Sequence, residues 1–271
     1  GSGNLELVKL LIAQGLSPKD QDDIGTTVLL NASEYGHLEV VKLLLEKGAN
    51  LREKNNYDET ALMGAARSGN VDLVQFLLAK GANLKDKNYL GESALMYAAR
   101  NGNLALVQFL IAQGLNLKDK DNNGETSLRW ATRNGHLELV QFLIAQGLNH
   151  KDKDNNGETA LLDAVRNGHV DVVKFLLEKG ANPNDKDSSG KSALMYASKE
   201  GYMKTVELLL EKGANPKEKK SMGETALMLA ASGGYLEVVK LLLEKGANPN
   251  EKTDLDETAL MYAAESGNVD L

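Results

Sequence analysis

The sequence predicts an all-α repeat solenoid, because glycine returns at a constant interval of 33 residues along the chain. The eight positions are Gly15, Gly48, Gly81, Gly114, Gly147, Gly180, Gly213 and Gly246. A fixed period of this size is typical of solenoids, in which each repeat buries its apolar face only against its neighbours. Two further observations agree with this: each period holds two apolar segments with helical spacing, and turn residues separate them.

Each period opens with a turn and a helix start. In the copy at residues 22–54 the fourth residue of the turn is Gly25, and glycine recurs there except at Asp58 and Asp256. Both residue types tolerate a left-handed backbone, so we expect a tight turn in every copy. Thr27 follows, and Ser or Thr holds its place in all copies. A hydroxyl just before an apolar segment predicts a helix N-cap.

Two helices complete the period. Leu29 and Ala32 are spaced by three residues, which puts them on one face of a short first helix. The second helix, residues 38–45, is apolar around most of its circumference, so we expect burial on more than one side before Gly48 ends it. All four phenylalanines hold one position of the second helix, where we expect core: Phe76, Phe109, Phe142 and Phe175.

This pattern resembles the ankyrin repeat over essentially the whole chain. The matching elements are the turn glycine, the T-x-L-x-x-A helix start, the G-H-L-E-V-V-K-L-L-L helix and the G-A-N end. The resemblance implies helix-turn-helix units with short extended turn tips. The family's usual T-P-L-H is replaced by variants such as Thr60-Ala61-Leu62-Met63. Without that Pro and His, we expect stability to depend more on hydrophobic contact.

The period predicts seven complete repeats over residues 22–252. Residues 1–21 would hold an expression scar, Gly1-Ser2, and a half-repeat with the second helix only, and residues 253–271 a C-terminal partial repeat. One interpretation is an excised piece of a longer array. The alternative is that segment 253–271 of one molecule is completed by segment 3–12 of the next, which gives a head-to-tail contact that need not close.

Composition and motifs exclude several classes of function. The net charge of −7 argues against nucleic-acid binding. There is no cysteine, no apolar run near the roughly 20 residues of a membrane span, and no secretory leader, so we expect a soluble cytoplasmic protein. Three of the four histidines recur at one repeat position and no catalytic motif occurs, so we expect no enzyme activity, metal or cofactor.

The resemblance implies that partners contact the turn tips and the exposed side of the first helix. One first-helix position there changes chemistry from copy to copy: Asn31, Gly64, Tyr97, Trp130, Asp163, Tyr196, Leu229 and Tyr262. Beside it, Arg129 replaces the Met or Leu of the other copies. Aromatic and Arg side chains are the usual anchors of interfaces. The alternative is that the aromatic rings only pack between neighbouring first helices.

A stripe of cations lies three positions further on, formed by Arg67, Arg100, Arg133, Arg166 and Lys199. An extended acidic peptide would suit it. The alternative is pairing with the glutamate of the same copy, at Glu59, Glu92, Glu125 and Glu158, which signifies little for binding. In the sixth copy Lys191 replaces that glutamate, so both Lys191 and Lys199 lack this partner.

We therefore predict a non-catalytic module that binds a protein or peptide partner, acidic in character, through its concave first-helix and turn-tip surface. The residues expected at the centre of that surface are Tyr97, Arg129, Trp130, Arg133, Asp163, Arg166 and Tyr196. The alternative is an engineered or excised scaffold with a structural role, self-assembling through its uncapped ends.

Overall fold

The computed structural model describes residues 4–266. In this part the chain forms sixteen α-helices and one short 3₁₀ turn, with β structure limited to isolated bridges. The helices fall into two compact units, unit 1 up to Ala131 and unit 2 from Thr132 onward. The division lies inside α8 (Ser127–Arg133).

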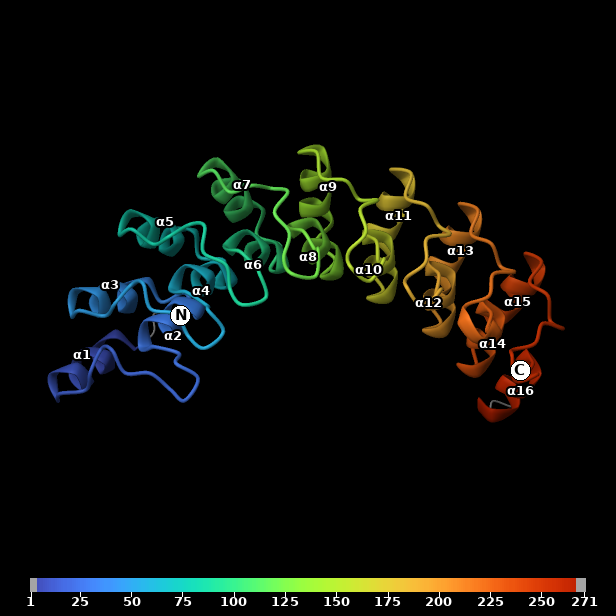
Figure 1. Cartoon of the computed structure of the whole chain (residues 1–271), viewed down its shortest axis with the longest axis horizontal. Helices are drawn as coiled ribbons and strands as arrows, with labels where there is room; N and C mark the ends of the chain where they lie inside the picture. Colours follow the sequence, from blue (N-terminus) through green and yellow to red (C-terminus); the bar gives the residue numbers. More distant parts are fainter. Residues whose placement is uncertain (1–3, 267–271) are drawn as a thin grey trace. The chain divides into compact units, whose positions relative to one another are not determined.

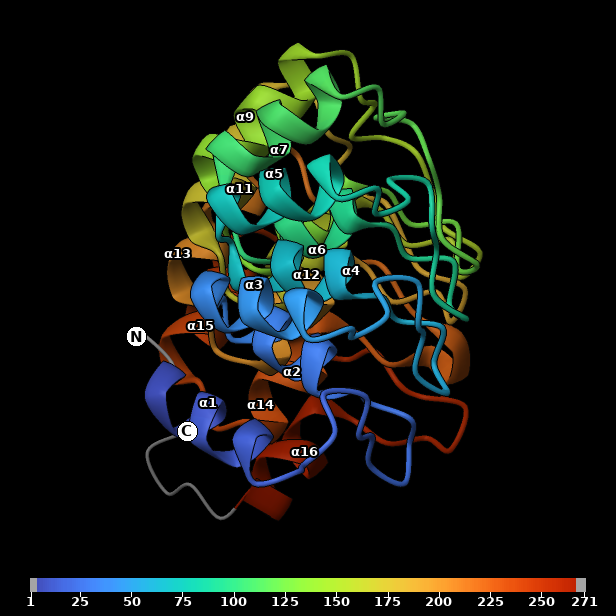
Figure 2. The same cartoon turned by 90° about the vertical axis from the view of Figure 1, so that its left-hand side faces the viewer.

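Unit 1 stacks pairs of helices in chain order. Its first helices are α2 (Val28–Glu34), α4 (Ala61–Ser68) and α6 (Ala94–Arg100), followed by the start of α8. Its second helices are α1 (Leu5–Ala13), α3 (Leu38–Glu46), α5 (Val71–Ala79) and α7 (Leu104–Ala112). Each of α2, α4 and α6 packs against the second helix that follows it, and α4 packs between α2 and α6 (Figure 1). The turn tips of unit 1 all project to one side of these helices (Figure 2).

Unit 2 repeats the same arrangement. Its first helices are α10 (Ala160–Arg166), α12 (Ala193–Lys199), α14 (Ala226–Ser232) and α16 (Ala259–Ser266). Its second helices are α9 (Leu137–Ala145), α11 (Val170–Glu178), α13 (Met203–Glu211) and α15 (Leu236–Glu244), and the 3₁₀ turn is η1 (Ser221–Gly223). The first helices pack on one another in order, and so do the second helices. The all-α repeat solenoid is thus confirmed, whereas the repeat boundaries at 22 and 252 stay a prediction.

Hydroxyl caps start most of the first helices, as predicted. The Thr27 hydroxyl accepts a hydrogen bond from the Leu30 backbone N–H at 3.2 Å. The same cap forms at Thr60, Thr159, Ser192 and Thr225. Ser93 is likewise the N-cap of α6, with the same extended backbone, but its hydroxyl makes no cap hydrogen bond.

Left-handed residues close the turns and end the second helices. Asp58 and Asp256 have φ of 59° and 63°, so aspartate adopts the left-handed conformation predicted for the glycine that it replaces. Gly48, with φ of 93°, ends α3. Its N–H donates to the Leu45 carbonyl at 3.1 Å and the next N–H donates to the Leu44 carbonyl at 2.9 Å, which is the Schellman arrangement. Met222 is also left-handed, with φ of 71°, which nothing in its residue type predicts.

The core consists of leucine, valine, alanine and methionine side chains at the contacts between helices. The expectation that the phenylalanines belong to it is wrong, because Phe76, Phe109, Phe142 and Phe175 are only half-buried. In α5 the buried stripe is Leu73, Val74 and Leu77, and Phe76 lies beside it with the Lys80 ammonium 5.6 Å from its ring centre. The second helices therefore bury a narrower face than their apolar sequence suggests.

Candidate partner-binding surface

Tyr97, in α6, lies at the centre of a buried polar cluster in unit 1. Its side chain is 2% exposed. Its hydroxyl accepts a hydrogen bond from Asn88 Nδ2 at 3.0 Å and donates to the Glu59 carboxylate at 2.9 Å, with Glu92 as a second acceptor at 3.1 Å. Burial, and then the negative charge of Glu92, raise the pKa of this hydroxyl well above its ordinary value. The phenol therefore stays neutral and bridges two carboxylates.

Two arginines of the cation stripe enclose the Tyr97 ring. The Arg67 guanidinium lies 4.6 Å from the ring centre and that of Arg100 lies 5.5 Å from it. Arg67 also pairs with Glu59, and Arg100 pairs with Glu92 at 2.9 Å. The predicted alternative, in which a stripe cation pairs with the glutamate of its own repeat, is confirmed at these two positions. In this part of unit 1 the charges are largely satisfied within the chain.

Trp130 and Arg129 are neighbours on α8 with different surroundings. Trp130 is half-buried, and the Arg100 guanidinium lies 3.8 Å from its ring centre. Arg129 is 4% exposed, and its guanidinium lies 3.8 Å from the buried Glu125 carboxylate. The helix thus turns Arg129 into the protein and leaves part of the Trp130 ring at the surface.

In unit 2 the buried acid Asp163 holds Arg133. Asp163 is 0% exposed on α10, and its carboxylate lies 3.3 Å from the half-buried Arg133 guanidinium. The Arg133 carbonyl lies 2.9 Å from His169 Nε2, which ties the end of α8 to the start of α11. Arg133 is therefore fixed at both its side chain and its backbone.

Tyr196, on α12, holds the place that Tyr97 holds in unit 1. The Arg166 guanidinium lies 4.6 Å from its ring centre and donates to its hydroxyl at 2.7 Å, and the hydroxyl donates to Asp187 at 2.7 Å. Burial, and then this hydrogen bond, raise the pKa of Tyr196 to about 12. Arg166 also pairs with Glu158, so the glutamate pairing predicted as the alternative is confirmed here too.

Three lysines gather beside Tyr196 and form what we call the lysine cluster: Lys191, Lys199 and Lys220. The Lys191 ammonium lies 4.1 Å from the Tyr196 ring centre. Burial, and then the charges of Lys199 and Lys220, lower the pKa of Lys191. Lys220 pairs with Glu224, but neither Lys191 nor Lys199 forms an ion pair with any residue in the described part of the chain.

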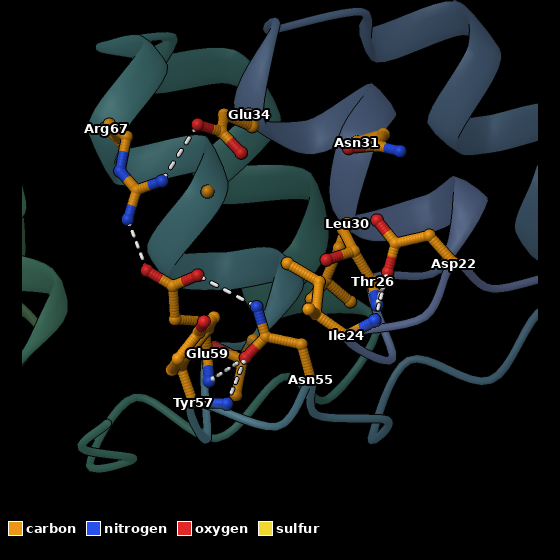
Figure 3. A pocket seen from close by; sticks show the side chains of 12 residues that line it. Asp22, Ile24, Thr26, Leu30, Asn31, Glu34, Asn55, Tyr57, Glu59 and Arg67 are labelled. Carbon is orange, nitrogen blue, oxygen red and sulfur yellow. Dashed lines mark hydrogen bonds and ion pairs between the residues drawn. The ribbon is translucent and has the colours of Figure 1, made fainter. Parts of the chain in front are cut away.

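A cavity of about 290 Å³ opens between α2 and α4 in unit 1. Figure 3 shows Arg67 spanning Glu34 and Glu59 on one wall and Ile24 and Leu30 on the other. Gly64 lies at the cavity and contributes no side chain. Tyr97 stands at the equivalent position one repeat later.

Comparison with known proteins decides the family of the chain. A family model described as ankyrin repeats (three copies) matches residues 1–88, 82–154, 146–220 and 194–271. The chain belongs to the ankyrin-repeat family. No curated protein is significantly similar to it. Ankyrin repeats are general protein-interaction modules and typically lack catalytic activity.

Other features of this ankyrin-repeat protein concern the membrane and metal ions. No helix within residues 4–266 combines the length and the apolar character needed to cross a bilayer. In the same residues, no three carboxylate or imidazole groups gather as the ligands of a metal ion would.

The residues predicted for partner binding fall into two groups by burial. Tyr97, Arg129 and Asp163 are buried and bonded within the protein. The others are half-buried and leave polar or aromatic surface exposed: Trp130, Arg133, Arg166 and Tyr196. Between the two groups, Asp163 forms an ion pair with Arg133.

Two features escaped the sequence interpretation. Lys220 belongs to the turn of the following repeat, and its charge acts on Lys191. Its position in the period did not predict that it lies near Lys191. Gly64 was visible as one member of a variable position, but the cavity beside it depends on how closely α2 and α4 approach. In the sequence, the cavity was indicated only by the missing side chain of Gly64 at a position where the next two repeats carry aromatic rings.

Proposed function

We propose that this chain is a non-catalytic module that binds a protein or peptide through the first-helix and turn-tip side of its ankyrin repeats. The observation that carries the proposal is that a half-buried aromatic ring and a half-buried guanidinium lie on the same first helix, α8, each in contact with a charged side chain of a neighbouring first helix. The Arg100 guanidinium lies over the Trp130 ring, and Arg133 forms an ion pair with Asp163. Groups that are rigid before binding lose little conformational entropy on contact, so they suit interface anchors.

An acidic segment is the partner chemistry that the lysine cluster favours. Lys191 and Lys199 offer two ammonium groups without an ion-pair partner in the described residues, and Tyr196 offers an aromatic face beside them. Burial, and then the charges of Lys199 and Lys220, lower the pKa of Lys191, and a carboxylate brought to these lysines would offset the repulsion between them. We therefore propose that unit 2 contributes the acid-binding part of the surface.

Peptides selected from a random displayed library against the folded chain test the proposal. Trp130→Ala and Arg133→Ala, made separately and together, should each weaken binding of the selected peptides by about 1–2 kcal/mol, because hot-spot residues dominate such interfaces. Gln141→Ala, an exposed change on the second helix α9 and away from the proposed surface, is the matched control and should leave affinity unchanged. Unaltered affinity in the double variant, with the circular dichroism of the wild type, contradicts the proposed surface.

Self-association is a second candidate, favoured by the exposed leucines of α1 and α16. Leu7, Leu10 and Leu11 are exposed on α1, and Leu260 and Met261 on α16. An apolar face of one copy against that of another would make the proposed head-to-tail contact. Residue 3 and segment 267–271, which are part of that prediction, lie outside the described residues.

Sedimentation velocity across a concentration series distinguishes the two candidates. Head-to-tail contact predicts growth of the average mass with concentration, and Leu10→Glu or Leu260→Glu should reduce it. A monomer at every concentration contradicts self-association and leaves the partner-binding proposal standing.

A further inference from the structure

We propose that the cavity at Gly64 binds a tyrosine side chain of the partner protein, with its ring in the place that Tyr97 fills one repeat later. The inference rests on the proposed protein-binding function and names the residue that unit 1 recognises. Gly64 stands at a first-helix position where the next two repeats carry aromatic side chains. At this position of the first helix, Tyr97 and Trp130 carry rings and Gly64 carries none.

The cavity is lined by the residues that lie one repeat before those surrounding Tyr97. The side chains that hydrogen-bond or stack with Tyr97 are Glu59, Arg67, Asn88, Glu92 and Arg100. Their equivalents 33 residues earlier are Thr26, Glu34, Asn55, Glu59 and Arg67. Every one of these equivalents lines the cavity. Asn55, Glu59 and Arg67 match the residue types found around Tyr97, whereas Thr26 and Glu34 replace a glutamate and an arginine. The cavity therefore repeats three of the five side chains that surround Tyr97 without a tyrosine of its own.

The polar end of the cavity matches a phenol hydroxyl. Asn55 Nδ2 donates a hydrogen bond to Glu59 at 2.9 Å. One repeat later, Asn88 Nδ2 donates to Glu92 at 2.7 Å and also to the Tyr97 hydroxyl. Burial opposes ionisation of Glu59, but hydrogen bonds from Asn55 and Tyr97 and the charge of Arg67 outweigh it and lower its pKa. An ionised Glu59 would accept a hydrogen bond from the phenol O–H, and the Asn55 amide would donate one to the phenol oxygen.

The rest of the cavity suits the ring. Ile24 and Tyr57, at 42% and 43% exposed, offer apolar surface at the mouth, and Leu30 lies deeper. Arg67, held by Glu34 at 2.8 Å, lies over the Tyr97 ring and also lines the cavity, where it holds the place that Arg100 holds beside Tyr97. The volume of about 290 Å³ lies at the lower limit of the roughly 300–1,000 Å³ of small-molecule sites, so it favours one side chain over a larger ligand.

The charge around the cavity selects a neutral ring. Asp22, Glu34 and Glu59 face it with Arg67 as the one cation among the lining residues. A phosphate on the incoming tyrosine would meet three carboxylates, and an acidic side chain would meet the same repulsion. The cavity is therefore specific for unmodified tyrosine, in contrast to the lysine cluster of unit 2.

Close packing is the other role of Gly64, and the variants must separate the two. A Cβ at residue 64 would lie 3.1 Å from the Glu34 backbone nitrogen, so Gly64→Tyr fills the cavity but also presses on α2. Asn31→Phe is the cleaner variant, because the exposed Asn31 side chain lines the cavity and makes no hydrogen bond with the described residues. Asn31→Gln is its matched control.

The experiment titrates the folded chain with p-cresol, the tyrosine side chain as a free molecule, and follows backbone amide NMR shifts. We expect a dissociation constant on the order of 1 mM, with shifts at Ile24, Tyr57, Glu59 and Gly64. Toluene should bind about tenfold more weakly, p-tolyl phosphate should cause no shift at these amides, and Asn31→Phe should abolish the p-cresol shifts while Asn31→Gln keeps them.

Three results would overturn the inference. One is no shift at these amides up to about 20 mM p-cresol; another is toluene binding as tightly as p-cresol; the third is an unchanged titration in Asn31→Phe. The test is independent of the library selection on Trp130 and Arg133, since neither residue lines this cavity. Failure here therefore leaves the broader protein-binding proposal intact.

Discussion

Tyr97 in unit 1 and Tyr196 in unit 2 hold the same position of the repeat and differ in what surrounds them. Tyr97 is enclosed by two arginines, and its hydroxyl lies between two carboxylates. Tyr196 has Arg166 on one side and Lys191 on another, and its hydroxyl donates to Asp187. Lysine stands at residue 191, where the neighbouring repeats have glutamate. The surroundings of Tyr97 are therefore paired within the chain, whereas those of Tyr196 keep cationic surface.

The largest expected difference between the two tyrosines is in stability. Tyr97→Ala removes a buried ring and leaves carboxylates and an amide without their partner, so it should cost about 3–5 kcal/mol of unfolding free energy. Tyr196→Ala removes a half-buried ring and should cost roughly half as much. Urea denaturation measures both, and equal losses would contradict the contrast in burial.

Alkaline pH should lower the stability of the folded chain, because Tyr97 and Tyr196 ionise at higher pH in the folded chain than in the unfolded one. The pKa of Tyr196 is about 12 in the folded chain against an ordinary value of 10.0, and that of Tyr97 is raised as well. Between these values the unfolded chain loses a proton that the folded chain keeps, so stability falls as pH rises from about 10 towards 12 and is unaffected below. Phenolate absorbance of the folded chain should show a step near pH 12 for Tyr196, and the Tyr196→Phe variant assigns that step.

The smallest effect on stability is expected from Lys191→Glu. It restores the glutamate found in neighbouring repeats and places it to pair with Lys199, so we expect a gain of about 0.2–1 kcal/mol, reduced at high salt. Lys191→Gln, which removes charge without adding a partner, should gain less. A loss of stability in both variants on thermal unfolding would show that the Lys191 side chain makes a net favourable contact, which contradicts this prediction.

The sequence predicted the fold because the repeat makes each local choice agree with the others. Thr27 as a cap, Gly48 as a helix end and Asp58 as a left-handed turn residue all follow from residue type alone. Phe76 was misplaced because the apolar pattern of a second helix does not say how wide a face its neighbours cover. That width is set by packing between helices.

The candidate site was predicted less completely, since its chemistry depends on contacts between repeats. The variable first-helix position and Lys191 were visible in the sequence. The burial of Tyr97 and Asp163 was not, because their repeat position holds both buried and half-buried side chains. The contribution of Lys220 and the cavity at Gly64 follow only once neighbouring repeats are stacked.

The central claim is that residue 191 decides whether this part of the surface is closed or open to an acidic partner. Its most direct test is the binding of a fluorescent oligoglutamate peptide to the wild type, Lys191→Arg and Lys191→Glu, with oligoglutamine as the uncharged control. We predict salt-dependent binding to the first two and at least about tenfold weaker binding to Lys191→Glu. Equal affinity of all three proteins for oligoglutamate would contradict the account.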